Sequence, residues 1–266
     1  MTAKLLVVLF WISAAVILPA EKYYVTFVKG NVLVEKTRKP LKVGDALNPE
    51  DKLIFSDKSA RVSFISPGKG RFDINPQAVK SGSKGELLAI VKSALIPASS
   101  TYHLSTRSLI FDGYDPRTYF TSSATHGRIL LIKSEPLPIN PSYKLDAVNF
   151  FFIQFTAEGK TITRKVDQNE KGIIFSDKLF LNPSGTVAEK VSLCYQTNIS
   201  GTARSSVVAA FTPVLAAKEE IIGQIELMRE MLGITDKKKL KTELSNHIFD
   251  NYGKAGEEVL NSMFGI

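Results

Sequence analysis

The chain has 266 residues, of which 44% are hydrophobic and 23% are charged, and its formal net charge is +8. This length allows one large domain or two ordinary ones, and the composition excludes an extended disordered chain. The positive charge favours anionic neighbours such as lipid headgroups, acidic cell-wall polymers or nucleic acid, but the 34 Lys and Arg residues are scattered. We therefore expect peripheral contact with an anionic polymer or a membrane at most, and no nucleic-acid partner.

Residues 1–20 have the layout of a secretory signal peptide. Lys4 precedes an apolar or small-residue run of 14 positions, Leu5 to Leu18, and Ala20 then precedes polar sequence. This layout predicts cleavage after Ala20 and a periplasmic or otherwise extracytoplasmic mature chain. The alternative is an uncleaved N-terminal helix that anchors the protein, although the run is shorter than the ~20 residues that a spanning helix needs.

Residues 21–97 are predicted to form a small β domain. From Tyr23 to Ile74, short β-branched and aromatic runs alternate with Gly, Pro and Asp turns at a spacing of roughly 8 to 12 residues, which is typical of a sandwich or barrel. The expected strands cover residues 24–28, 31–35, 41–43, 52–55, 61–65 and 71–74. Residues 86–96 fit a short helix and a buried strand equally well.

Four acidic residues, Asp45, Glu50, Asp51 and Asp57, are concentrated between Val43 and Phe64. Their spacing lacks the alternating oxygen ligands and the closing Glu of a calcium loop. A catalytic pair of carboxylates is the alternative, because such pairing is spatial and not sequential. The neighbouring Gly, Pro and Ser residues favour a third interpretation, in which each short acidic side chain bonds the backbone of its own turn.

The order of these turn motifs resembles the FecR-like domain. The matching segments are Val28–Val32, Leu41–Leu47, Asp51–Leu53, Ser59–Val62 and Gly70–Pro76. The resemblance covers about residues 23–80, and it implies a small extracytoplasmic β module that binds or signals through protein contacts. The family motif contains no catalytic residue. Members that regulate sigma factors carry a cytoplasmic helical region before a membrane span, and the four residues before the apolar run here depart from that layout.

Residues 98–127 are expected to connect this domain to an immunoglobulin-like β-sandwich over residues 128–212. The sequence around Glu158-Gly159 has the layout of a β-hairpin. The expected strands cover residues 128–132, 148–155, 161–166, 173–175, 190–196 and 205–211, the content of such a sandwich. The Cys, Trp and Cys triplet of antibody domains is absent, so only the architecture is inferred.

Residues 213–266 are predicted to form a helical tail. A first helix is expected to begin with Thr212 as its cap and Pro213 as its first residue, and to end at Gly233. A second helix starts at Thr235-Asp236 and ends at Gly253, and a third covers residues 257–264. Apolar residues repeat on one face of the first two helices. We expect this face to pack against the chain's own sheet or the other helices, with a partner protein as the alternative.

Other candidate site residues have simpler interpretations. Cys194 lies in a strand pattern, which favours a buried thiol, and the three histidines, His103, His126 and His247, are dispersed along the chain. Asn198 starts a glycosylation-type triplet. The basic run Lys237–Lys239 with Lys241 lies at a helix start and is expected to be a solvated face, with an anionic contact as the alternative.

The sequence has no glycine-rich phosphate loop, no Cys/His metal spacing and no Gly-x-Ser-x-Gly motif. We therefore expect a mainly β, exported bacterial envelope protein that is not an enzyme and has no catalytic residue, cofactor or metal. Its expected role is protein interaction, in signalling or assembly, with an envelope protein as partner. The alternative is binding or hydrolysis of a cell-wall polymer, with Asp45 and Asp51 as the carboxylates to replace.

Overall fold

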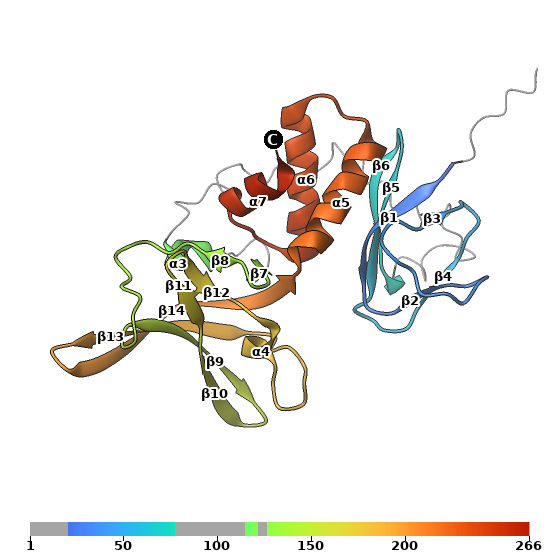
Figure 1. Cartoon of the computed structure of the whole chain (residues 1–266). Helices are drawn as coiled ribbons and strands as arrows, with labels where there is room; N and C mark the ends of the chain where they lie inside the picture. Colours follow the sequence, from blue (N-terminus) through green and yellow to red (C-terminus); the bar gives the residue numbers. More distant parts are fainter. Residues whose placement is uncertain (1–20, 78–114, 122–126, 266) are drawn as a thin grey trace, which may run out of the picture.

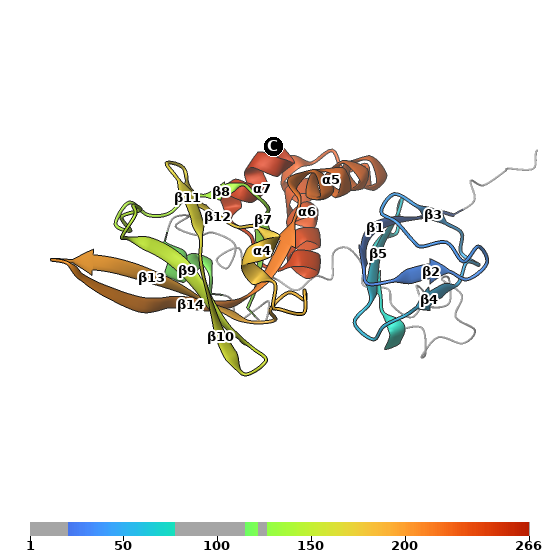
Figure 2. The ribbon, with the colours of Figure 1, turned by 60° about the horizontal axis from the view of Figure 1, so that its bottom comes forward.

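The computed structural model describes residues 21–77, 115–121 and 127–265. The predicted signal peptide, most of the connecting segment and residues 78–97 of the first predicted domain lie outside these ranges. The fold is mainly β, as predicted, and two β units lie on either side of a layer of helices (Figures 1 and 2). In the part of the chain described, no helix has both the length and the apolar character needed to cross a membrane.

The first β unit covers residues 21–77 and contains β1 (Tyr23–Lys29), β2 (Val32–Val34), β3 (Ala46–Leu47), β4 (Leu53–Phe55), β5 (Arg61–Ser66) and β6 (Gly70–Ile74). An antiparallel sheet has the order β3-β1-β5-β6, and β2 pairs with β4 in a separate ladder. A core that includes Tyr23, Val32, Leu53 and Phe64 lies against one face of the larger sheet. Five of the six predicted strands are confirmed within a few residues.

The predicted strand at residues 41–43 is wrong, because this segment is a loop that wraps around β1. The Leu41 N–H donates to the Val32 carbonyl at 2.8 Å, and the buried Leu41 side chain joins the core. The Gly44 N–H donates to the Val25 carbonyl, and the Val25 N–H donates to the Asp45 carbonyl. These single backbone hydrogen bonds attach the segment to β1 and β2 without regular strand pairing. A regular ladder with β1 forms only at β3.

A β-bulge in β1 aims one aromatic side chain at the helices. The pairing of β1 with β5 shifts register between Val25 and Phe27. Before the shift Val25 faces the interior core of the first unit, whereas Phe27 faces the helices after it. The Phe27 ring lies 5.2 Å from the Tyr252 ring in an edge-on contact. An extra residue in one strand re-aims the side chains that follow it, which explains this change of face.

The second β unit contains β7 (Arg128–Ile132), β8 (Pro136–Leu137), β9 (Phe150–Ala157), β10 (Lys160–Lys165), β11 (Asp167–Asn169), β12 (Gly172–Ile174), β13 (Val191–Ile199) and β14 (Thr202–Ala216), with short helices α3 (Pro116–Tyr119) and α4 (Asp177–Phe180). The sheets have the orders β10-β9-β13-β14-β7 and β11-β12-β8. A core rich in phenylalanine contains side chains from both sheets, as in a β-sandwich. The predicted β9–β10 hairpin is confirmed, with φ of 52° at Glu158 and 72° at Gly159.

The predicted helix start at Thr212-Pro213 is wrong, because β14 continues through both residues to Ala216. Pairing with β13 ends at Phe211, and parallel pairing with β7 begins at Thr212. The Thr212 N–H donates to the Gly127 carbonyl on the β7 side. Neighbouring residues of a strand direct their N–H groups to opposite sides. The backbone nitrogen of Pro213 therefore points to the β13 side, where pairing has already ended. Because no strand pairs with β14 there, the N–H that proline lacks removes no hydrogen bond from the sheet.

The C-terminal helices are α5 (Lys218–Leu232), α6 (Lys237–Tyr252) and α7 (Glu257–Phe264). Gly233 ends α5, Asp236 caps α6 by accepting the Lys239 N–H at 2.9 Å, and Gly253 ends α6, as predicted.

These helices form the central layer of the molecule, which corrects the prediction of a tail. Their shared core contains Ile225 and Ile248, together with Phe27 and Ile65 of the first unit and Leu130, Ile132 and Ala216 of the second. The expected packing of the apolar helix faces within the chain is confirmed.

Candidate functional site

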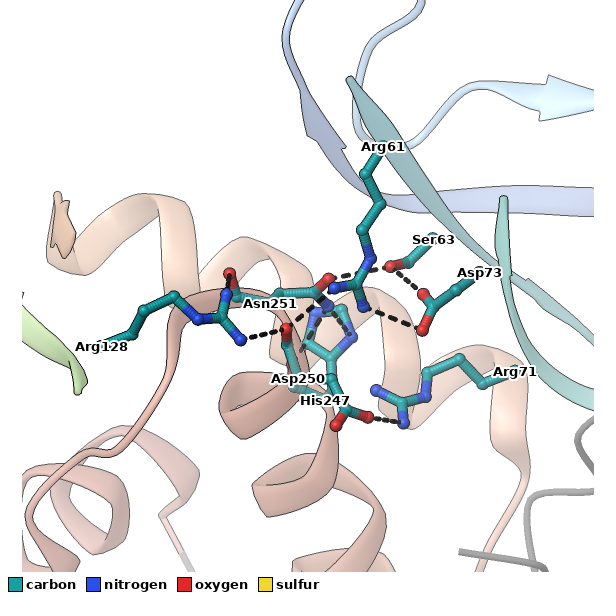
Figure 3. A network of polar contacts seen from close by, with 8 residues as sticks. All are labelled: Arg61, Ser63, Arg71, Asp73, Arg128, His247, Asp250 and Asn251. Carbon is teal, nitrogen blue, oxygen red and sulfur yellow. Dashed lines mark hydrogen bonds and ion pairs between the residues drawn. The ribbon is translucent and has the colours of Figure 1, made fainter. Parts of the chain in front are cut away.

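Eight polar residues meet where the end of α6 packs against the first sheet and β7. We call this cluster the polar joint, and it consists of Arg61, Ser63, Arg71, Asp73, Arg128, His247, Asp250 and Asn251 (Figure 3). Its members come from β5, β6, β7 and α6. The polar joint therefore connects both β units to the same helix.

Strand alternation places the polar residues of β5 and β6 on one face. Successive side chains of a strand point to opposite sides of the sheet. The even-numbered Val62, Phe64 and Phe72 enter the core of the first unit. The odd-numbered residues of the two strands face the other way, and in an isolated sheet they would face water. Here α6 covers that face, because Ser63 bonds Asn251 and Arg71 bonds Asp250.

Three arginines meet the last turn of α6. The Asp250 carbonyl accepts from Arg61 Nη1 at 3.0 Å and from Arg128 Nη2 at 3.2 Å, and the Asn251 carbonyl accepts from Arg128 Nη1 at 3.3 Å. The Asp250 carboxylate forms an ion pair with Arg71. Carbonyls in the last turn of a helix lack helical partners and carry partial negative charge, so cationic donors stabilise this end.

Asp73 and Ser63 continue the polar joint on the sheet side. Asp73 accepts from Arg61 Nη2 at 2.9 Å, and the Ser63 hydroxyl lies within hydrogen-bonding distance of both Asp73 Oδ1 and Asn251 Oδ1. A serine hydroxyl carries one proton, so it donates to only one of these oxygens at a time.

His247 is enclosed and neutral. Its Nδ1 lies 3.1 Å from Asn251 Nδ2, which can only donate, so Nδ1 accepts and the proton is on Nε2, 2.9 Å from Gln224 Oε1. Burial, followed by the positive charges of Arg71 and Arg61, holds the pKa of His247 well below its usual value of 6.5. This side chain is therefore an uncharged structural link.

A chain of hydrogen bonds continues from His247 to α5. Gln224 Nε2 donates to the Tyr252 hydroxyl, which donates to Glu220 Oε1 at 2.8 Å. Burial and the charge of Glu220 raise the pKa of Tyr252. The polar residues of α6 are thus connected to α5 on one side and to the first sheet on the other.

The polar joint does not have the geometry of a Ser–His catalytic pair. Asn251 bonds both Ser63 and His247 and so lies between them. Ser63 and His247 are both 0% exposed. An accessible nucleophile and a base in direct contact with it are the requirements for nucleophilic catalysis. The contacts of the polar joint instead hold α6 against the sheet.

The acidic turn residues are not part of the polar joint. Asp45 Oδ2 accepts the Lys42 N–H at 2.8 Å, Asp51 Oδ2 accepts the Asn48 N–H at 2.7 Å, and Asp57 Oδ1 accepts the Ser59 N–H at 2.9 Å. Hydrogen bonding by Ser59 is the main cause that lowers the pKa of Asp57. The turn interpretation is confirmed for these three carboxylates, and Glu50 is exposed in the same turn as Asp51.

The other candidates are dispersed. Cys194 in β13 is 2% exposed, as predicted, and burial raises the pKa of its thiol. The Asn198 N–H donates to Asn149 Oδ1 at 2.8 Å. Lys237–Lys239 are exposed in the first turn of α6, and Lys241 pairs with Glu257 at 3.3 Å. His103 and His126 lie outside the described residues. In the described ranges no three His, Cys, Asp or Glu side chains are grouped as metal ligands.

The sequence alone does not predict the polar joint. The alternation of polar and apolar residues in residues 61–65 was recognisable, but an alternating strand ordinarily exposes its polar side to water. The sequence gives no signal that brings residues 247–251 onto that side. In comparisons with known proteins, no family model, no curated protein and no solved structure matches the chain.

Proposed function

We propose that this chain is an exported bacterial envelope protein that acts as a protein-interaction or assembly module without catalysis. The proposed contact surface is the hairpin of β13 and β14 from Gln196 to Val207, which we call the arm. The hairpin projects away from the rest of the molecule (Figures 1 and 2). The arm is at the opposite side of the second unit from the helices, so it is available to a partner.

The β14 edge of the arm is open to pairing, whereas on the β13 edge the Asn198 N–H already donates to Asn149 Oδ1. β9 pairs with β13 only as far as Gln196, and β7 pairs with β14 only from Thr212. Among the residues described, no further strand continues the ladder beside residues 202–211. Unpaired N–H and C=O groups along a strand are a template for a strand from another chain.

The composition of this edge does not prevent pairing. Proteins ordinarily protect an edge strand with Lys, with Pro, with inward charges or with a β-bulge. Residues 202–211 contain one charged residue, Arg204, and neither Lys nor Pro. The pairing of β14 with β13 shifts register between Val207 and Ala209, but Thr202 to Val207 pair without a bulge. This regular stretch of edge, without such protection, is the single observation that supports the interaction proposal most strongly.

Exposed aliphatic side chains lie on both faces of the arm. Ile199 is 59% exposed and Val207 is 63% exposed. Ile199 pairs with Thr202, and Val207 pairs with Cys194. Because faces alternate along each strand, the two aliphatic side chains point to opposite faces of the ribbon. A partner could therefore add a strand to the edge and pack apolar side chains on either face.

The resemblance of residues 23–80 to the FecR-like domain agrees with this proposal, because that resemblance implies a β module that works through protein contacts. The alternative of cell-wall polymer binding or hydrolysis was based on the acidic turn residues and the net charge. Three of those carboxylates bond the backbone of their own turns, so no specific observation favours the alternative.

Replacing the exposed aliphatic residues of the arm tests the proposal. The variant Ile199→Thr/Val207→Thr keeps β-branched side chains and removes the apolar ends. The control Val43→Thr/Val148→Thr changes side chains that are 41% and 47% exposed elsewhere. In affinity purification from the native host, the parent and the control should retain the same envelope protein and the arm variant should lose it. Equal retention by the arm variant, or turnover of peptidoglycan by the purified chain without a partner, would overturn the proposal.

Export rests on the sequence of residues 1–20 alone and has its own test. N-terminal sequencing of the mature protein from the host envelope should give Glu21 as the first residue. A mature chain that still begins at residue 1 would favour the anchored alternative.

A further inference from the structure

In the arm, every second residue of β14 directs its backbone groups toward the open edge. On the other strand of the arm, the Asn198 N–H donates to Asn149, which directly precedes β9, and so points away from β14. Asn198 pairs with Ala203, and the two residues of an antiparallel pair direct their N–H and C=O groups either toward or away from each other. Ala203 therefore directs its groups to the open edge, and the alternation adds Ser205 and Val207 before the bulge.

The other edges of this five-stranded sheet are covered or protected. On the outer side of β7, Ile129 bridges to Lys254. The edge strand at the opposite end is β10, which carries Lys160, Arg164 and Lys165. Charged residues of this kind prevent pairing with another strand. The described sheet therefore offers one open stretch of edge per chain, and assembly through it closes at two copies instead of forming a fibre.

The open stretch is complementary to itself when two copies run antiparallel about a twofold axis at Ser205. In this register Ala203 faces Val207 of the second copy, Ser205 faces its own counterpart, and Val207 faces Ala203. Each of these three pairs exchanges two backbone bonds, which gives roughly six hydrogen bonds. The register centred on Ser205 therefore satisfies all the backbone groups that the regular stretch directs to the open edge.

Charge and space agree with the same register. Arg204 is the one charged residue between positions 202 and 211, and it faces Ser206 of the second copy, so no like charges are opposed. The Ser200-Gly201 turn of the second copy lies beside residues 209–210 and stops short of Thr212, where pairing with β7 begins. Because each arm projects from its own body, the two bodies lie at opposite ends of the pair (Figures 1 and 2).

We propose that the arm pairs edge to edge with the arm of a second copy of this chain, antiparallel and about a twofold axis at Ser205. This inference rests on the proposed function, because it names the partner of the same contact surface. Val207, which is 63% exposed in the single chain, then lies beside Ala203 of the second copy. The regular stretch is far shorter than the roughly 20 to 30 residues a side of a standard interface, so the dimer is weak and depends on concentration.

Position-specific disulfide cross-linking of the purified chain tests this register. In a Cys194→Ser background, Ser205→Cys places two thiols across the axis with about 5.5 Å between their Cα atoms, a separation typical of a disulfide. Ala203→Cys is the matched control, because it is also exposed on the same face, but its two copies lie four residues apart along the pair, about 13 Å. Under mild oxidation at up to about 1 mM chain, which detects even weak pairing, Ser205→Cys should give about tenfold more disulfide-linked dimer than Ala203→Cys.

A mixture of Ala203→Cys and Val207→Cys chains should also cross-link, because these two positions face each other across the pair. Equal cross-linking of Ser205→Cys and Ala203→Cys, or no dimer from Ser205→Cys, overturns pairing with a second copy. If position 205 gives no dimer while a photoreactive group at position 207 captures a different envelope protein, the arm remains the contact surface and only the second copy is wrong. If neither position gives a product, the proposed function fails together with this inference.

Discussion

Three arginines from three different strands, Arg61, Arg71 and Arg128, bond the last turn of α6. Arg128 is half-buried, and burial together with the charge of Arg61 lowers its pKa. The Asp250 and Asn251 carbonyls accept hydrogen bonds from Arg128, and the charge of Asp250 acts in the opposite direction on its pKa, so these groups offset part of the cost of burying the guanidinium. The polar joint therefore depends on each of its charges having a partner.

Stability should depend on pH through His247. Its pKa is lowered in the folded chain, so below pH 6.5 the unfolded chain binds a proton that the folded chain does not. The unfolding free energy should therefore fall with decreasing pH by about 1.4 kcal/mol per unit, until the pH reaches the lowered pKa. Chemical denaturation of the parent and of His247→Gln between about pH 7 and pH 5 measures this contribution as the difference in slope. Identical slopes would show that His247 is not buried in its neutral form.

Removing one cation of the polar joint should cost more than removing a surface cation. Arg71 is 11% exposed and Asp250 is 31% exposed, so Arg71→Met leaves a partly buried carboxylate without its ion pair. We expect a loss of about 2 to 3 kcal/mol in the free energy of unfolding. Lys133→Met is the matched control, because the pair of Lys133 and Asp177 is 37% and 52% exposed and should contribute less than about 1 kcal/mol. Equal losses in urea denaturation would contradict a structural role for the polar joint.

At the scale of elements, local sequence patterns predict most strands and helices correctly. They do not predict which other elements these strands and helices contact. Glu158-Gly159 identified a hairpin, and Asp236 and Gly253 identified the ends of α6, because turn and cap chemistry is local. The pattern at Pro213 predicts a helix start. Its actual place inside β14 depends on where the pairing with β13 ends, which is not a local feature. The polar joint was missed because the partners of residues 61–73 are more than 170 positions away in α6. Contacts at such separation leave no pattern in a single sequence.

The break between α6 and α7 is an element whose geometry requires glycine. Gly253 has φ of 100°, and a Cβ there would lie 2.5 Å from the Arg128 carbonyl oxygen. The following residue extends the sheet, since the Lys254 N–H donates to that carbonyl at 3.0 Å and the Leu130 N–H donates to the Lys254 carbonyl at 2.7 Å. This short segment joins the helix layer to the outer edge of β7.

Two Gly→Ala substitutions should therefore have opposite effects. Gly253→Ala should destabilise the protein by at least ~2 kcal/mol, because it combines a positive φ with a close backbone contact. Gly223 lies on the exposed side of α5, with nothing within 4 Å of an added methyl group. Because alanine favours a helix more than glycine does, Gly223→Ala should raise the free energy of unfolding by up to ~1 kcal/mol. Thermal unfolding of both variants provides the comparison, and a neutral Gly253→Ala would contradict the described contact with β7.

At the scale of the whole molecule, the helices connect two β units into one body. Phe27 and Ile65 from the first unit share a core with Leu130 and Ile132 from the second, with α5 to α7 between them. The arm is the contrasting part, because both of its faces and its long edge are exposed at the end of the second unit. A body with fixed internal contacts and one projecting, unprotected ribbon is well suited to presenting that ribbon to a partner.

Site-specific photo-crosslinking in the native host tests the interaction proposal most directly. A photoreactive amino acid is placed at Val207 on the arm, and at Val43 as a control, which is exposed in the first unit. We expect one discrete adduct with an envelope protein from position 207 and none from position 43. The absence of an adduct from position 207, or the same adduct from both positions, would contradict the assignment of the arm as the contact surface.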